Sequence, residues 1–90
     1  MKSIDDLVSD VNDAVERFSR STASSPEVDF YIWMRQARFD AAVAHWRAAP
    51  TYNLKAHYAD LARKRARTVI NRIKAAQLLR RVCAEARAKK

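Results

Sequence analysis

Five basic side chains in the last third of the chain have the types and the spacing to bind a row of phosphates. On a helix, four of them share one narrow arc at intervals of 4, 7 and 7 residues, and the fifth flanks that arc. These candidate nucleic-acid-binding residues are Arg63, Lys64, Arg67, Lys74 and Arg81. An Arg side chain binds a phosphate bidentately, and each phosphate that a cation neutralises releases condensed counterions. The row would extend about 27 Å along a straight helix, so it predicts a contact with nucleic acid, either DNA or RNA.

The net charge of the chain supports this prediction, because it is concentrated in the second half. Residues 1–50 contain 6 Lys or Arg against 8 Asp or Glu, a sum of −2, whereas residues 51–90 contain 12 against 2, a sum of +10, which together give +8. Like charge on one segment destabilises a folded chain by self-repulsion, so it indicates an anionic partner, either nucleic acid or an acidic protein surface. The tract RKRAR at residues 63–67 resembles, in composition, the arginine-rich helices that bind RNA. The alternative interpretation is a charged face that keeps a helix in water.

A second set of residues indicates a protein partner. The first helix is expected to have an acidic face and the second an aromatic one, and both could dock on another protein. The residues are Asp6, Asp10, Asp13, Phe30, Trp33 and Met34. Simple solvation of the acidic face is the competing interpretation. Because the acidic and basic helices are complementary, a homodimer is a further alternative. The alternative function is therefore a protein–protein interaction module that inhibits or bridges a larger complex, of the small helical kind that phages and mobile elements often encode.

Catalytic and metal-binding chemistry has little support. His45 and His57 stand 12 residues apart and Cys83 is the single cysteine, so the spacing of a metal site is missing. Cys83 is expected to pack as a small apolar residue. The chain contains no glycine, which excludes a glycine-rich phosphate loop. We therefore expect no enzyme activity, no metal, no cofactor and no small-molecule substrate.

The composition predicts a single all-α domain. Without glycine and with only two prolines, tight hairpins are disfavoured, whereas the abundant Ala, Arg, Leu and Lys favour helix. A chain of 90 residues builds only a marginal core, which dimerisation would reinforce. No run approaches 18 apolar residues, and the acidic N-terminus lacks the layout of a signal peptide. We expect a cytoplasmic protein that does not enter a membrane.

Helices are expected over about residues 4–19, 26–49 and 53–88, with a link at residues 20–25. The fold class is thus a small three-helix bundle with a long basic C-terminal helix, or four helices if the last segment breaks near residues 64–68. Ser3 and Asp6 form a near match to a capping box at the first helix. One apolar face follows, made of Ile4, Leu7, Val8, Val11, Ala14, Val15 and Phe18.

The second helix has two apolar faces. It is expected to begin with Ser25 as N-cap before Pro26, and to end before Pro50. One face contains Val28, Ile32, Phe39, Val43 and Trp46, and the opposite one contains Phe30, Trp33, Met34, Ala37, Ala41, Ala44 and Ala48. A helix that is apolar on both sides is expected in the middle of the fold, between the first helix and either the third helix or a second subunit. Both tryptophans are then expected in the core.

The third helix has a less regular apolar stripe. Thr51 or Asn53 is expected to cap it, and the stripe contains Leu54, Tyr58, Leu61, Val69, Ala76, Leu79 and Cys83. Arg65 and Arg72 fall in the same arc, so they need a partner if they are buried. Asp29 or Asp40 could pair with them, but we expect the two guanidinium groups to reach solvent along their aliphatic stems.

Overall fold

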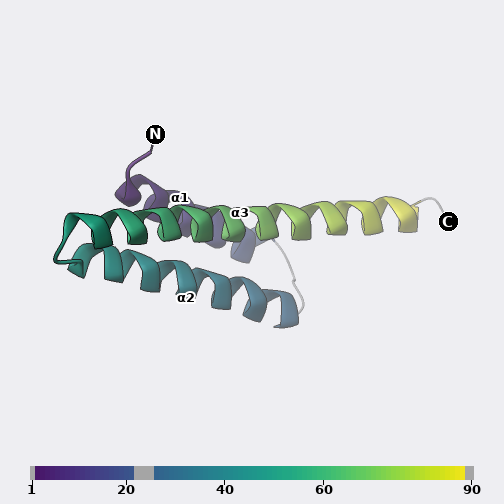
Figure 1. Cartoon of the computed structure of the whole chain (residues 1–90). Coiled ribbons are helices and arrows are strands. Elements are labelled where there is room, and N and C mark those ends of the chain that lie inside the picture. Colours follow the sequence, from purple (N-terminus) through teal and green to yellow (C-terminus); the bar gives the residue numbers. More distant parts are fainter. Residues whose placement is uncertain (1, 22–25, 89–90) are drawn as a thin grey trace.

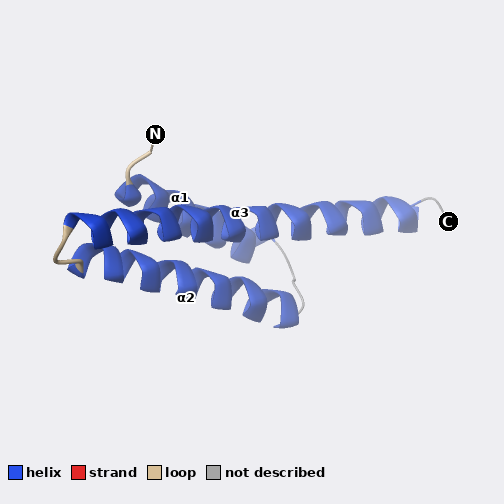
Figure 2. Ribbon diagram, in the orientation of Figure 1, coloured by secondary structure: helices blue, strands red, loops and turns tan. Residues whose placement is uncertain are grey.

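The computed structural model of this chain describes residues 2–21 and 26–88, with side chains for residues 2–19 and 30–88. Three helices make up nearly all of it: α1 (Ile4–Ser21), α2 (Pro26–Ala48) and α3 (Tyr52–Ala88) (Figures 1 and 2). The described residues contain no strand, so the all-α class is confirmed. α3 is one continuous helix of 37 residues, so the four-helix alternative is wrong. Ser25, the expected cap of α2, and most of the expected link lie outside the described residues.

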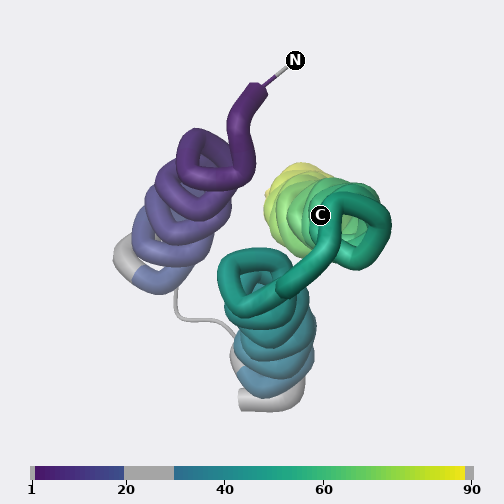
Figure 3. The backbone as a smooth tube through the Cα atoms, turned by 60° about the vertical axis from the view of Figure 1, so that its left-hand side comes forward, coloured from purple at the N-terminus to yellow at the C-terminus, as the bar shows by residue number. Residues whose placement is uncertain are grey.

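The three helices lie around one apolar core, and α3 is much the longest. α1 and α3 run in the same direction and α2 runs in the opposite one (Figure 1). Seen nearly along α3, the helices stand at the corners of a triangle (Figure 3). The C-terminal part of α3 continues past the ends of α1 and α2 (Figure 1), which gives the molecule its elongated extents of 59 × 25 × 16 Å. We call α3 from Leu78 onward the projecting part; none of its described residues is buried, although the Arg80 guanidinium still contacts the Phe18 ring of α1.

All three helices contribute to the core. Its buried side chains are Ile4, Val11, Phe18, Ile32, Phe39, Ala42, Val43, Ala62, Ala66, Val69 and Ile73. Phe18 and Phe39 are the largest of these that are fully buried. α3 contributes two alanines to the buried set, and small side chains at a contact shorten the distance between helix axes. Beyond Ile73, no described residue of α3 is buried.

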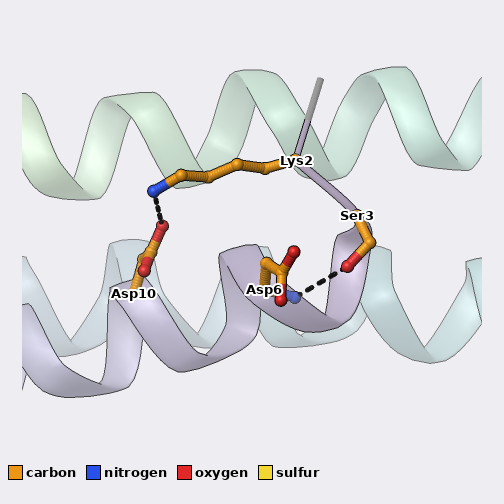
Figure 4. Close-up of polar contacts among 4 residues, drawn as sticks. All are labelled: Lys2, Ser3, Asp6 and Asp10. Carbon is orange, nitrogen blue, oxygen red and sulfur yellow. Dashed lines mark hydrogen bonds and ion pairs between the residues drawn. The ribbon is translucent and has the colours of Figure 1, made fainter.

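The N-terminal turns of α1 and α3 are capped as expected. The Asp6 backbone N–H donates to Ser3 Oγ over 3.1 Å (Figure 4), and the Leu54 N–H donates to Thr51 Oγ1 over 3.2 Å. Thr51, and not Asn53, is therefore the cap of α3. The single apolar face of α1 is also confirmed, because all seven of its predicted residues are buried or half-buried.

The predicted double-sided burial of α2 is wrong. Ile32, Phe39 and Val43 of the first face are buried, as expected. The second face is largely exposed, with Phe30 60% and Trp33 62% accessible. The reason is that α1 and α3 both pack on the first side of α2, so nothing within the described chain covers the second. Trp33 is therefore not a core residue, while Trp46 is half-buried at the edge of the core.

The predicted apolar stripe of α3 needs a similar correction. Val69 is buried, but Leu54 and Leu79 are exposed and so is Cys83, which does not pack as a small core residue. The other helices contact the side of α3 that contains Ala62 and Ala66. A periodicity analysis that gives more weight to large apolar side chains ranks this side too low. Leu79 and Cys83 also lie on the projecting part. In the described part of the chain, no helix has an apolar stretch long enough to cross a bilayer.

Candidate nucleic-acid interface

Four of the five predicted phosphate-binding residues are exposed on α3. Lys64, Arg67, Lys74 and Arg81 all face solvent, and we call these four residues the basic row. At 3.6 residues per turn, Arg67, Lys74 and Arg81 lie roughly 110° round the helix from its buried residues. They therefore lie on the flank of α3 that faces α1 and not directly opposite the core. The reason is that the buried residues of α3 occupy a different arc from the predicted apolar stripe.

Arg63 differs from the other four predicted residues. Its side chain is only 29% exposed, and its Nε atom is buried without a hydrogen-bond partner. Its guanidinium lies 3.9 Å from the Asp60 carboxylate, one turn earlier on α3. With Arg67, it borders a groove of about 310 Å³ between α1 and α3, which Leu7 and Ile70 also line. Arg63 is thus partly committed to packing against α1.

The acidic residues of α1 form no described ion pair with the basic row, although Asp10 lines the same groove as Arg67. In the described part of the chain, Lys2 pairs with Asp10 (Figure 4), and Arg47 pairs with Asp5 at 3.1 Å. The hydrogen bond that Lys2 Nζ donates to the Asp10 carboxylate raises the pKa of the Lys2 amine. No described ion pair involves a residue of the basic row. Asp6 and Asp13 are exposed, so the predicted acidic face of α1 is also open to solvent.

The structure brings together a second group of basic side chains, on the flank of α3 that faces α2. Arg65 Nη1 donates to the Arg38 carbonyl oxygen over 2.8 Å, and the Arg72 guanidinium lies 5.5 Å from the centre of the Tyr31 ring. Neither Arg65 nor Arg72 contacts Asp40, one of the carboxylates suggested by the sequence, and the side chain of Asp29 lies outside the described residues. Each guanidinium therefore contacts a neutral group, and its positive charge is not balanced by a described carboxylate.

Arg35 completes this second group. Its Nη2 donates to the Tyr31 hydroxyl over 2.7 Å, and its guanidinium stacks 4.9 Å from the same ring centre. A small pocket of about 60 Å³ lies beside it, and its lining residues are Arg35, Arg38, Arg65 and Thr68. We call this the arginine pocket. Sequence reasoning missed it because Arg35 and Arg38 belong to the half of the chain with a net negative charge. The available signal was the spacing of Tyr31, Arg35 and Arg38, which places them on one side of α2.

The aromatic residues of the alternative, protein-binding interpretation are also accessible. The Phe30 and Trp33 rings contact each other with centres 6.0 Å apart, and Met34 is half-buried. Trp33 borders a pocket of about 250 Å³ with Val15 and Phe18 of α1. The projecting part of α3 adds Leu78, Leu79 and Val82 to the exposed apolar side chains.

The two histidines, far apart in sequence, both contact one tyrosine. The His45 ring stacks on Tyr58 with centres 5.0 Å apart, and His57 meets the same ring edge-on at 5.1 Å. Among the residues whose positions the structure describes, no three or more His, Cys, Asp or Glu side chains gather in a way that could hold a metal ion.

Comparison of the chain with protein-family models, with curated proteins and with solved structures finds no match, so a function has to be argued from these surfaces alone.

Proposed function

We propose that this protein is a small helical accessory or regulatory protein that binds nucleic acid electrostatically through α3, its basic C-terminal helix. The observation that carries the proposal is the basic row: its four cations are exposed and have no ion pair among the described residues. Cations that are already paired gain little from a phosphate, whereas unpaired ones bind it and release its counterions. Lys64 and Arg67 lie on the part of α3 that packs against the other helices, and the same continuous helix carries Lys74 and Arg81 further on.

The spacing of the row suits a phosphate backbone. Arg67, Lys74 and Arg81 follow each other at intervals of seven residues, which is about 10.5 Å per step on a helix. Duplex DNA carries about one charge per 1.7 Å of its axis, so each cation has several phosphates within reach. Arg81 is exposed and lies about two turns of α3 beyond Ile73, the last buried residue of that helix, so a bulky polymer can approach it.

A charge-matched pair of variants tests the proposal. The row variant replaces Lys64, Arg67, Lys74 and Arg81 with Gln, and the control variant replaces four cations elsewhere, Lys2, Arg17, Arg47 and Lys55. Both have the same net charge, so a general attraction weakens equally in both. We expect the row variant to bind a labelled oligonucleotide at least about tenfold more weakly than the control, because it lacks the phosphate contacts. Circular dichroism checks that both variants are folded. Equal affinities of the two variants would show that the row is an ordinary solvated surface.

A protein-binding role is the second candidate, and the exposed pair Phe30 and Trp33 favours it. Large aromatic side chains on a surface are typical anchors of protein interfaces. This candidate, an adaptor or inhibitor that also associates with itself, predicts that Trp33→Ala abolishes recovery of protein partners or of a dimer. Affinity capture with and without nuclease, together with light scattering of the purified chain, provides the readout. Companions that disappear after nuclease treatment, with a monomeric mass at all concentrations, would count against it.

A further inference from the structure

The arginine pocket has the chemistry of an anion site. Arg35 and Arg38 of α2 and Arg65 of α3 line it. Three residues that each carry a positive charge therefore line a space of about 60 Å³. In the described part of the chain, no carboxylate lies within ion-pair distance of any of them. Their mutual repulsion is unfavourable unless a counter-ion occupies the space between them.

The guanidinium groups are held in place by other contacts. Arg35 is fixed by its hydrogen bond to the Tyr31 hydroxyl and by stacking on that ring. Arg65 is fixed by its hydrogen bond to the Arg38 carbonyl. Groups positioned before a ligand arrives lose less conformational entropy on binding it, so they bind it more tightly.

Unused hydrogen-bond donors remain in this arrangement. The Nε atom of Arg35 is buried and has no acceptor, and a buried donor without a partner is costly. The Arg38 carbonyl oxygen accepts from Arg65, and no described hydrogen bond or ion pair uses the Arg38 guanidinium. The Thr68 hydroxyl donates to the Lys64 carbonyl over 3.1 Å, so Thr68 forms part of the wall and supplies no further donor. The Arg35 Nε atom itself has almost no accessible surface, so the donors open to a ligand are the guanidinium N–H groups of Arg38 and Arg65 that no described hydrogen bond uses. Such donors match a ligand that only accepts hydrogen bonds.

We propose that the arginine pocket binds a phosphoryl group, either as inorganic phosphate or as the terminal phosphate of a nucleic-acid strand. The forked donors of Arg match the oxygens of a phosphate, which can accept from several arginines at once. A single water needs only about 10–15 Å³, so the pocket has room for a tetrahedral oxyanion. An internal phosphodiester continues in two directions, which a small pocket disfavours. This site lies on the α2 flank of α3 and is independent of the basic row.

The first test is a titration with inorganic phosphate, followed by two-dimensional NMR at constant ionic strength in chloride. We expect saturable one-to-one binding, with shifts of the Arg35 Nε–H signal and of the amides around Thr68. The pocket variant Arg38→Gln with Arg65→Gln should bind phosphate at least tenfold more weakly. The charge-matched control, Lys74→Gln with Arg81→Gln, should bind it within about twofold of the parent. Equal weakening in both variants, or shifts confined to the basic row, would overturn the proposal.

The source of the phosphoryl group is settled by two oligonucleotides of one sequence that differ only in a 5′-phosphate. If the pocket takes a strand end, the parent prefers the phosphorylated oligonucleotide and the pocket variant loses that preference. If the parent binds inorganic phosphate but shows no such preference, the pocket takes free phosphate. Absence of both effects contradicts the site. Because these experiments use pocket variants while the basic row stays intact, their failure is distinguishable from failure of the proposed nucleic-acid binding. The single variant Arg65→Lys retains the charge but not the forked donors of Arg, so we expect it to lose most of the affinity for phosphate as well.

Discussion

Single residues of this chain show how the same side-chain type is used for different purposes. Arg63 packs beside α1 and Arg65 reaches a backbone carbonyl of α2, whereas Arg67, only two positions further, is exposed without an ion pair. Successive positions on a helix are rotated by about 100°, so neighbours in sequence face different surroundings. A basic tract is therefore best interpreted residue by residue.

The cap of α3 provides a prediction at this scale. Thr51→Ala removes the oxygen that accepts the Leu54 N–H, which leaves a backbone donor at the helix start without its side-chain partner. We expect a loss of about 1 kcal/mol in the free energy of unfolding, measured by urea denaturation. Asn53→Ala is the matched control and should change stability by less than half as much, because Thr51 supplies the cap. Equal losses would show that the cap geometry is wrong.

Asp40 provides a second prediction, through the effect of pH on stability. Partial burial raises the pKa of the Asp40 carboxyl above its usual value. A carboxyl whose pKa is higher in the folded than in the unfolded chain destabilises the fold when it is ionised. This penalty disappears as the pH falls through the folded-state pKa and below the pKa of the unfolded chain. We therefore expect Asp40→Asn to stabilise the protein slightly at pH 7, by a few tenths of a kcal/mol at this largely exposed site. At pH 3 the gain should vanish. A variant that is less stable than the parent at pH 7 would show that Asp40 makes a favourable contact.

At the scale of elements, the success of sequence reasoning depends on how each helix is covered. α1 packs against the other helices on one side only, and its large apolar residues are regularly spaced. Its buried face could therefore be predicted completely. α2 has apolar residues all round, and periodicity does not tell which side the other helices choose. α3 is buried along Ala62 and Ala66, and alanine gives a weak signal in any pattern that ranks residues by apolar size.

The candidate site could be predicted only in part, for the same reason. The exposed cations of α3 follow from charge and spacing within one helix. The arginine pocket depends on how Arg35 and Arg38 of α2 are placed against Arg65 of α3, 27 residues from Arg38 in sequence. A contact between elements is decided by packing, and it leaves no pattern along one helix.

The projecting part of α3 leads to the third prediction. A chain that ends after Gln77 retains every buried residue of the core, because none of those described lies beyond Ile73. It would lose the contact of the Arg80 guanidinium with the Phe18 ring, at 4.9 Å. We expect the midpoint of thermal unfolding to fall by about 4–8 °C, since one cation–π contact contributes about 1 kcal/mol and a domain of this size loses about that many degrees per kcal/mol. Val69→Ala, which removes buried atoms, should cost more. Unfolding of the shortened chain would show that the projection is part of the core.

At the scale of the whole molecule, positive charge is placed on two sides of one helix. Arg67, Lys74 and Arg81 of the basic row lie on the α1 flank of α3, and the arginine pocket lies on its α2 flank. The described ion pairs involve none of these cations. A small domain has little stability in reserve, and uncompensated charge reduces it further. An anionic partner would relieve this repulsion, which is why both proposals predict that binding stabilises the fold.

The salt dependence of nucleic-acid binding tests the central claim most directly. If the four cations of the basic row neutralise phosphates of duplex DNA, the logarithm of the association constant falls with the logarithm of salt concentration more steeply in the parent than in the row variant. The difference in slope should be about 3 to 4. The control variant, with the same net charge, should keep most of the slope of the parent. Equal slopes for the row variant and the parent would contradict the account.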